Sequence, residues 1–211
     1  GLKCYIFMPS NMSEERKTMM KIFGSIIIDA PENDFVEAIA MRDRFLEDNT
    51  SAWSPKQFSN LDNVECHQSI TAPEIKKQVK DLDKKWSAFI HGSGTGGTIE
   101  GVRKYVRKNC LETKVVMVIP EESPHGIQGI GDGKDFLATP EKMDDIIKIK
   151  TIKEISRAKK FSRETGILVG ISSGANILAS EKWLAKNPDC ETIVTMLCDR
   201  GERYMSVYGK I

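Results

Sequence analysis

A run of glycines and threonines between residues 92 and 98 has the composition of an anion-binding loop. The run, Gly92-Ser-Gly-Thr-Gly-Gly-Thr98, follows an apolar stretch and precedes a stretch with helical periodicity. Glycines let the backbone take positive φ and approach a ligand closely, and the free N–H groups at a helix start attract negative charge. The hydroxyls of Thr95 and Thr98 add two further donors. The pattern therefore predicts a phosphate site rather than an ordinary turn.

Two widespread phosphate motifs fit this run poorly. Gly92, Gly94 and Gly97 satisfy the G-x-G-x-x-G pattern of dinucleotide sites, and Glu121 or Glu122 stands about where a ribose-binding acid is expected. That unit normally opens its domain, whereas here it lies far into the chain. The Walker pattern fails because the loop contains no lysine. A nicotinamide-dependent oxidoreductase is kept as an alternative.

A second candidate site is the segment Ser172-Ser-Gly174. Here an apolar stretch opens directly into an alanine-containing helix, so that two hydroxyls stand at the helix start. Hydroxyls in this position can bind a ligand, or they can simply cap the helix. The residue types alone leave both interpretations open.

Strand and helix patterns alternate along the chain. This alternation predicts an α/β fold in three layers, with parallel sheets covered by helices on both faces. Strands are expected at 3–8, 25–29, 86–91, 114–119, 145–149 and 191–197, and helices at 13–24, 33–49, 64–70, from 73, from 98 and from 151.

Two local patterns refine this scheme. Turn formers cluster between residues 54 and 73, and we therefore predict a smaller N-terminal domain at 1–60 and a larger C-terminal domain with the phosphate loop at 61–211. Thr151 and Glu154 have the spacing of a capping box, which predicts that they start the helix from 151 together.

Composition excludes several classes of function. The 31 basic and 30 acidic residues nearly cancel, so neither nucleic acid nor an anionic membrane is an expected partner. No apolar run approaches the length of a membrane span. Single, dispersed cysteines favour a reducing cytoplasm over a disulfide frame, and the histidines lack metal-ligand spacing, so no metal is expected. The cysteines are Cys4, Cys66, Cys110, Cys190 and Cys198.

Motifs along nearly the whole chain resemble the cysteine synthase and cystathionine β-synthase family, the fold type II enzymes that use pyridoxal phosphate. The matching segments are Met8-Pro-Ser-Asn-Met-Ser-Glu-Glu-Arg-Lys17, Gln57-Phe-Ser-Asn60, Ala72-Pro-Glu-Ile75, Gly94-Thr-Gly-Gly-Thr98, Ile127-Gln-Gly-Ile-Gly131 and Gly170-Ile-Ser-Ser-Gly174. Ala72 stands where the family has glycine. The stretch from Cys198 to Ser206 is more similar to the B isozyme of cysteine synthase than to the A isozyme. The order and spacing of these motifs carry the resemblance.

The resemblance implies a site for pyridoxal phosphate and a small amino-acid substrate. The residues it assigns to the cofactor phosphate are Gly94, Thr95, Gly96, Gly97 and Thr98. It also implies Ser172 at the pyridine nitrogen, Cys198 beside the cofactor, Gln57 at the substrate carboxylate and Gly129 in the loop over the substrate. A neutral hydroxyl at the pyridine nitrogen suits β-elimination and replacement.

The activity implied is that of an O-acetylserine (thiol)-lyase, which replaces acetate with sulfide to give L-cysteine. The family also implies a homodimer and, as a partner, serine acetyltransferase. Cystathionine β-synthase-type activity is an alternative, as is a non-catalytic relic that binds a partner.

Two family segments have no counterpart in these 211 residues: the S-x-K-[DN]-R segment with the Schiff-base lysine, and the following S-G-N-T-G loop. We therefore expect a fold that is incomplete at its N-terminus, from a truncated or partial chain without a catalytic lysine. Such a chain is expected to be inactive alone, unless an upstream segment exists in the parent protein. Lys134, close to a glycine-rich stretch, is expected to be a surface charge.

Overall fold

The computed structural model describes residues 1–109, 111–131 and 137–209. Cys110 and Lys134 lie outside the described residues. The chain divides into two compact units, Gly1–Pro55 with Arg200–Ile211, and Lys56–Asp199. The sequence placed the division between 60 and 61, and it assigned the last residues of the chain to the larger domain. The structure instead groups those last residues with the N-terminal unit.

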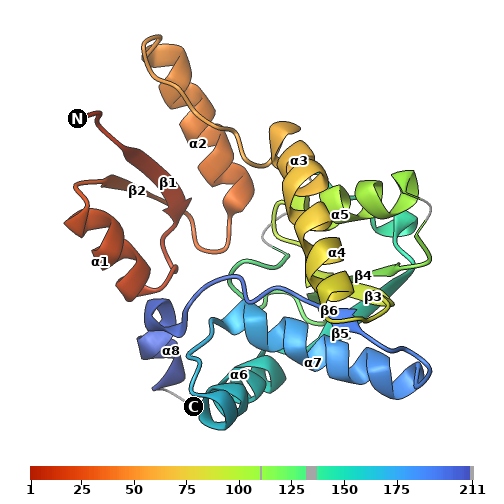
Figure 1. The fold of residues 1–211 in the computed structure, drawn as a ribbon. Helices are drawn as coiled ribbons and strands as arrows, with labels where there is room; N and C mark the ends of the chain where they lie inside the picture. Colours follow the sequence, from red (N-terminus) through yellow and green to blue (C-terminus); the bar gives the residue numbers. More distant parts are fainter. Residues whose placement is uncertain (110, 132–136, 210–211) are drawn as a thin grey trace. The chain divides into compact units, whose positions relative to one another are not determined.

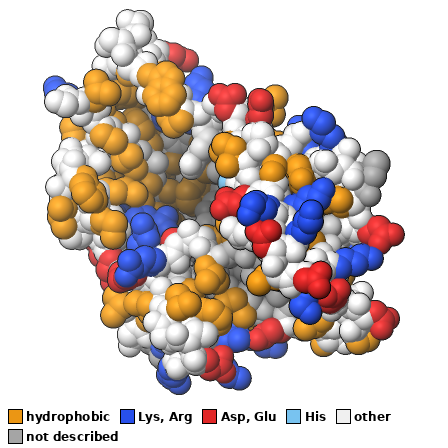
Figure 2. All heavy atoms as spheres, in the orientation of Figure 1, with side chains coloured by type: hydrophobic (Ala, Val, Ile, Leu, Met, Phe, Trp, Pro, Cys, Tyr) orange, Lys and Arg blue, Asp and Glu red, His pale blue; other side chains and the backbone are white. Residues whose placement is uncertain are grey.

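The first unit contains a parallel pair of strands, β1 (Tyr5–Pro9) and β2 (Ile26–Ala30), with Tyr5 opposite Ile26. Its helices are α1 (Glu14–Ile22), α2 (Phe35–Asp48) and α8 (Met205–Tyr208), and a 3-10 turn spans Gly201–Tyr204. Figure 2 shows hydrophobic side chains gathered over this unit, where Phe23 and Trp53 are both 82% exposed. Two strands bury little apolar surface, so this unit has the smaller core.

The second unit is built on a four-stranded parallel sheet in the order β5-β4-β3-β6 (Figure 1). Its strands are β3 (Ala88–Gly92), β4 (Lys114–Pro120), β5 (Asp145–Ile149) and β6 (Ile193–Val194). Its helices are α3 (Asp62–Cys66), the π-helical turn η1 (His67–Thr71), α4 (Ala72–Asp81), α5 (Gly97–Lys108), the 3-10 turn η2 (Pro140–Lys142), α6 (Thr151–Thr165) and α7 (Ile171–Lys186).

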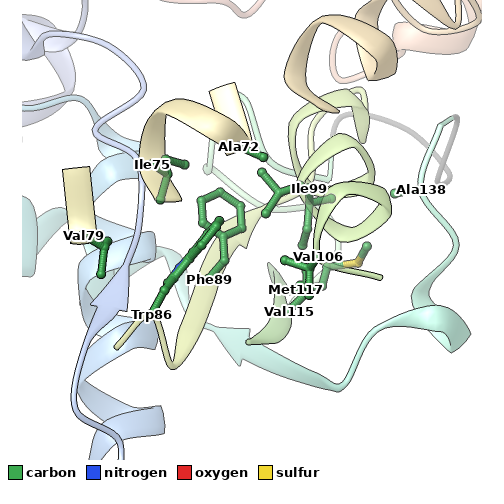
Figure 3. Close-up of a cluster of buried hydrophobic side chains, with 11 residues drawn as sticks. Ala72, Ile75, Val79, Trp86, Phe89, Ile99, Val106, Val115, Met117 and Ala138 are labelled. Atoms are coloured by element: carbon green, nitrogen blue, oxygen red, sulfur yellow. The ribbon is translucent and has the colours of Figure 1, made fainter. Parts of the chain in front are cut away.

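One face of this sheet is packed by α4 and α5. Phe89 of β3 is fully buried and lies edge-on to Trp86, with 6.3 Å between ring centroids. Figure 3 shows these two rings among the aliphatic side chains of both helices, including Ile75 and Ile99. Close packing of this kind fixes the position of α5, whose first turn follows the glycine loop.

The opposite face is covered by α7, which Figure 1 shows on the other side of the sheet from α4 and α5. The α/β prediction, with parallel sheets and helices on both faces, is therefore confirmed. The last strand was predicted at 191–197, but only Ile193–Val194 pair with β3. The residues after Val194 turn instead toward the first turns of α7.

The predicted capping box at the start of α6 is wrong. Thr151 is the first helical residue rather than the cap, and its backbone N–H donates to Glu122 Oε1 at 2.7 Å. Neither carboxylate oxygen of Glu154 has a hydrogen-bond partner among the described residues, and the side chain is fully buried. The carboxylate of Glu122, distant in sequence, therefore accepts the hydrogen bond at the helix start. Glu154 does not cap the helix and is buried instead.

Candidate functional site

The glycine-rich run joins the carboxyl end of β3 to the start of α5. All five residues of β3 are buried, which fixes the point where the loop begins. Gly96 takes a left-handed conformation (φ 84°) and is the N-cap of α5. No described residue accepts a hydrogen bond from the backbone N–H of Thr98 or Ile99 in the first turn. These free groups and the helix dipole make the turn suited to binding an anion.

Close approaches explain why this loop needs its glycines. A Cβ atom at Gly94 would lie 2.6 Å from the carbonyl oxygen of Gly129, and one at Gly96 would lie 2.6 Å from the backbone nitrogen of Ala138. A Cβ at Gly97 would overlap the side-chain amide of Asn63. The loop is therefore enclosed by neighbouring backbone and leaves room only for hydrogen at these positions.

The loop borders a cavity of about 170 Å³ at the carboxyl edge of the sheet. The residues that line it are His91, Gly92, Gly94, Thr95, Gly96, Thr98, Ile99, Gly129, Ile130 and Cys198. They come from the loop after β3, the loop after β4 and the segment after β6. Because the chain leaves β3 toward β4 on one side and returns as β6 on the other, the cavity lies where ligands bind in open α/β sheets.

Two residues that the sequence reasoning missed brace the threonines of the loop. Asn63 Nδ2 donates to Thr95 Oγ1 at 3.1 Å, and His67 Nε2 lies 3.1 Å from Thr98 Oγ1. His67 Nδ1 lies 2.9 Å from Thr71 Oγ1, and burial lowers the pKa of His67 below its usual value. Both hydroxyls are thus held in place from α3 and η1, where helical periodicity alone gave no sign of a role.

Replacing Asn63 with alanine should loosen Thr95 without disturbing the core. Loss of one hydrogen bond of about 1 kcal/mol predicts that inorganic phosphate binds about fivefold more weakly. Asn109→Ala is the control, since Asn109 Nδ2 donates to a backbone carbonyl at the far end of α5. Isothermal titration measures the affinity of both variants for phosphate. Equal affinities would show that Asn63 does not support the phosphate loop.

The start of α7 lies beside the loop at Gly129, which lines this cavity. Ser172 is buried, and its Oγ lies 3.9 Å from where a Cβ of Gly129 would be. Ser173 Oγ accepts a hydrogen bond from the backbone N–H of Cys198 at 3.1 Å. Desolvation by the surrounding protein raises the pKa of the Cys198 thiol above its usual value. The structure thus brings Ser172, Cys198 and Gly129 to one region, and their roles toward a cofactor and a substrate stay predictions.

Of the predicted site residues, Gly97, Ser172 and Gln57 do not line the cavity, and Gln57 lies in the segment before α3. The residue is exposed, and its backbone oxygen accepts a hydrogen bond from Asn63 Nδ2 at 2.9 Å. Since Asn63 also holds Thr95, Gln57 is connected to the phosphate loop through its main chain. The role of its side chain at a substrate carboxylate stays a prediction.

Comparison with known proteins identifies the family. A family described as pyridoxal-phosphate dependent enzyme matches residues 1–199. The chain belongs to this family. It is 34% identical to the cysteine synthase of Staphylococcus aureus, over 98% of this chain and 69% of the relative. It is 36% identical to cysteine synthase B of Campylobacter jejuni, over 98% of this chain and 71% of that protein.

A solved structure, that of a hydrogen sulfide-producing enzyme from Fusobacterium nucleatum, superposes with a TM-score of 0.88 at 33% identity. The match covers 98% of this chain and 65% of that one. The predicted fold type II architecture is therefore confirmed for the residues compared. Glu122, one of the two acidic residues considered for the dinucleotide alternative, is hydrogen-bonded to the start of α6.

The cavity suits the cofactor of this family. Pyridoxal phosphate carries one phosphate monoester, and the first turn of α5 offers free N–H groups and braced hydroxyls at one place. The remaining lining includes uncharged groups of His91, Ile130 and Cys198, which can border an aromatic ring. Among the described residues no three His, Cys, Asp or Glu side chains gather as a metal site, and no helix is long and apolar enough to cross a membrane.

Proposed function

We propose that this protein is a cysteine synthase that replaces the acetate of O-acetylserine with sulfide, and that residues 56–199 hold its pyridoxal phosphate. The observation that carries the proposal is the braced glycine loop at the edge of a cavity of about 170 Å³. Relatives named cysteine synthase, matched over 98% of this chain, support the choice of reaction.

Each group around the cavity has a proposed task. The backbone N–H groups of Thr98 and Ile99 and the hydroxyls of Thr95 and Thr98 bind the phosphate, and the dipole of α5 favours its charge. When bound, the cofactor supplies an electron sink for loss and replacement of a β-substituent. Ser172 offers its neutral hydroxyl to the pyridine nitrogen. Such a partner does not force a proton onto that nitrogen.

The substrate side and the partners are also proposals. Gly129, which lines the cavity with φ 96°, borders the space for the amino acid, and Gln57 is proposed for its carboxylate. We further propose a cytoplasmic homodimer that docks serine acetyltransferase, in keeping with the dispersed cysteines and the family.

Ligand-induced stabilisation tests the cofactor assignment. Pyridoxal phosphate and 4-deoxypyridoxine 5′-phosphate, which lacks the aldehyde, should both raise the melting temperature, whereas NAD should not. The analogue separates binding in the cavity from chance reaction with surface lysines. Stabilisation by NAD alone would contradict the assignment.

The reaction is tested on the protein purified at its natural length. With O-acetylserine and sulfide, L-cysteine should form, and it should form faster than cystathionine does when homocysteine replaces sulfide. Cofactor binding without turnover of either acceptor would favour the non-catalytic relic instead.

A further inference from the structure

Asn176 joins three segments of the chain at the cavity. Its Oδ1 accepts a hydrogen bond from the backbone N–H of Gly92 at 2.8 Å, and its Nδ2 donates to the backbone oxygen of Met196 at 3.0 Å. The same Nδ2 lies 3.2 Å from Nδ1 of His91. Asn176 is fully buried in α7. One side chain of α7 therefore connects the end of β3, including the cavity histidine His91, with the segment after β6.

These contacts fix the orientation of the Asn176 amide. A backbone N–H can only donate and a backbone carbonyl can only accept, so Oδ1 must face Gly92 and Nδ2 must face Met196. Nδ2 is then a donor toward His91, and Nδ1 of His91 must accept. The proton of the neutral ring consequently lies on Nε2.

His91 is neutral over the physiological range. Burial, with a smaller contribution from the positive charge of His67, lowers its pKa to about 4. Protonation would also set two N–H donors against each other at the contact with Asn176. The ring therefore keeps one acceptor, Nδ1, taken by Asn176, and one donor, Nε2.

The wall that this network shapes lies beside the phosphate loop. His91, Gly92 and Cys198 all line the cavity, and Asn176 contacts the first two directly. Cys198 is held by Ser173, three residues before Asn176 on α7, and its sulfur lies 3.6 Å from Asn176 Nδ2. Asn176 has no hydrogen bond to the described residues of the first turn of α5, so a shift of its amide should affect this part of the wall more than the phosphate loop.

We propose that Asn176 is a positioning residue of the cofactor site, and that it holds His91 as the Nε2–H tautomer so that the wall presents a neutral donor to the ring of bound pyridoxal phosphate. The inference rests on the proposed function, since it takes the cofactor as the ligand of this cavity. It adds His91 as a specificity determinant for the part of the ligand beyond the phosphate.

Asn176→Asp tests the proposal with little change of shape. Aspartate can still accept from Gly92 but cannot donate to His91 or Met196, and its charge should raise the pKa of His91 and move the ring proton to Nδ1. We expect 4-deoxypyridoxine 5′-phosphate to bind about tenfold more weakly, and inorganic phosphate to change less than about twofold. Asn187→Asp is the matched control, because Asn187 donates to Trp183 O at the other end of α7.

Nitrogen NMR of the imidazole rings reads the tautomer directly, and the chain has only three histidines to assign. An Nδ1–H tautomer of His91 in the unaltered protein would overturn the proposal, even if Asn176→Asp failed to fold. Equal loss of phosphate and analogue binding in Asn176→Asp would overturn it too, because that pattern indicates general damage. If the unaltered protein binds no analogue but shows the Nε2–H tautomer, the proposed function fails and the positioning of His91 stands.

Discussion

Replacing Gly96 with alanine is expected to weaken binding of pyridoxal phosphate by at least about 100-fold. The left-handed φ of 84° already disfavours alanine, and its Cβ would lie 2.6 Å from the backbone nitrogen of Ala138. Backbone cannot swing aside as a flexible side chain can, so the loop must shift. A shifted loop loses two or more hydrogen bonds to the phosphate, each worth about 1.5–3 kcal/mol because the acceptor is charged.

Gly166→Ala separates the loss of the site from simple backbone strain. Gly166 also takes a left-handed conformation (φ 74°), at the C-terminus of α6, but nothing lies within 4 Å of its Cβ position. Both variants should lose about 1 kcal/mol of stability through φ alone. Titration with 4-deoxypyridoxine 5′-phosphate should find the affinity of Gly166→Ala unchanged. Comparable weakening in both variants would show that the Gly96 contact does not shape the site.

The phosphate loop could be predicted from sequence because its signal is local. Five neighbouring glycines and threonines between a buried strand and a helix specify the turn, the free N–H groups and the donors together. The strand and helix order was equally readable, since alternation of short apolar runs with helical periodicity predicts a parallel sheet. The cofactor that the loop binds could be predicted only from the family resemblance, because one kind of phosphate site can serve several cofactors.

The residues around the loop could not be predicted because their roles depend on contacts between distant segments. Asn176 and Gly92 are 84 residues apart, and Asn63 and Thr95 are 32 apart. An asparagine inside a helix and another at a helix start read as ordinary surface or capping residues. The wrong capping box has the same origin, because Glu122 reaches Thr151 from the loop after β4.

Glu154 is expected to make the second unit less stable as the pH rises. The side chain is fully buried, without a partner among the described residues. Burial and, second, the negative charge of Glu122 raise its pKa from 4.5 to about 10. The folded state therefore keeps a proton between pH 4.5 and 10 that the unfolded state releases. Within this window stability should fall by up to about 1.4 kcal/mol per pH unit.

The range above about pH 7.5 isolates most of this effect. There His91, whose pKa is lowered from 6.5 to about 4, is mostly neutral in both states, and it destabilises the fold as the pH falls from about 7.5 toward 4. Between about pH 7.5 and 8.5 a negative slope of stability should therefore come mainly from Glu154, because the Cys198 thiol, with an ordinary pKa of 9.0, begins to contribute only at the upper end of this range. Substitution by glutamine keeps the shape of the side chain and removes the titration.

Glu154→Gln should consequently flatten the slope and gain stability as the pH rises, with its advantage largest at pH 8.5. Urea denaturation followed by fluorescence measures the second unit, because Trp86 and Trp183 are buried there while Trp53 of the first unit is exposed. The control is Glu141→Gln, an exposed position in which the slope should persist. Equal slopes in Glu154→Gln and in the unaltered protein would mean that Glu154 is ionised in the fold. In that case a cation must balance the carboxylate charge, or hydrogen-bond donors must stabilise it.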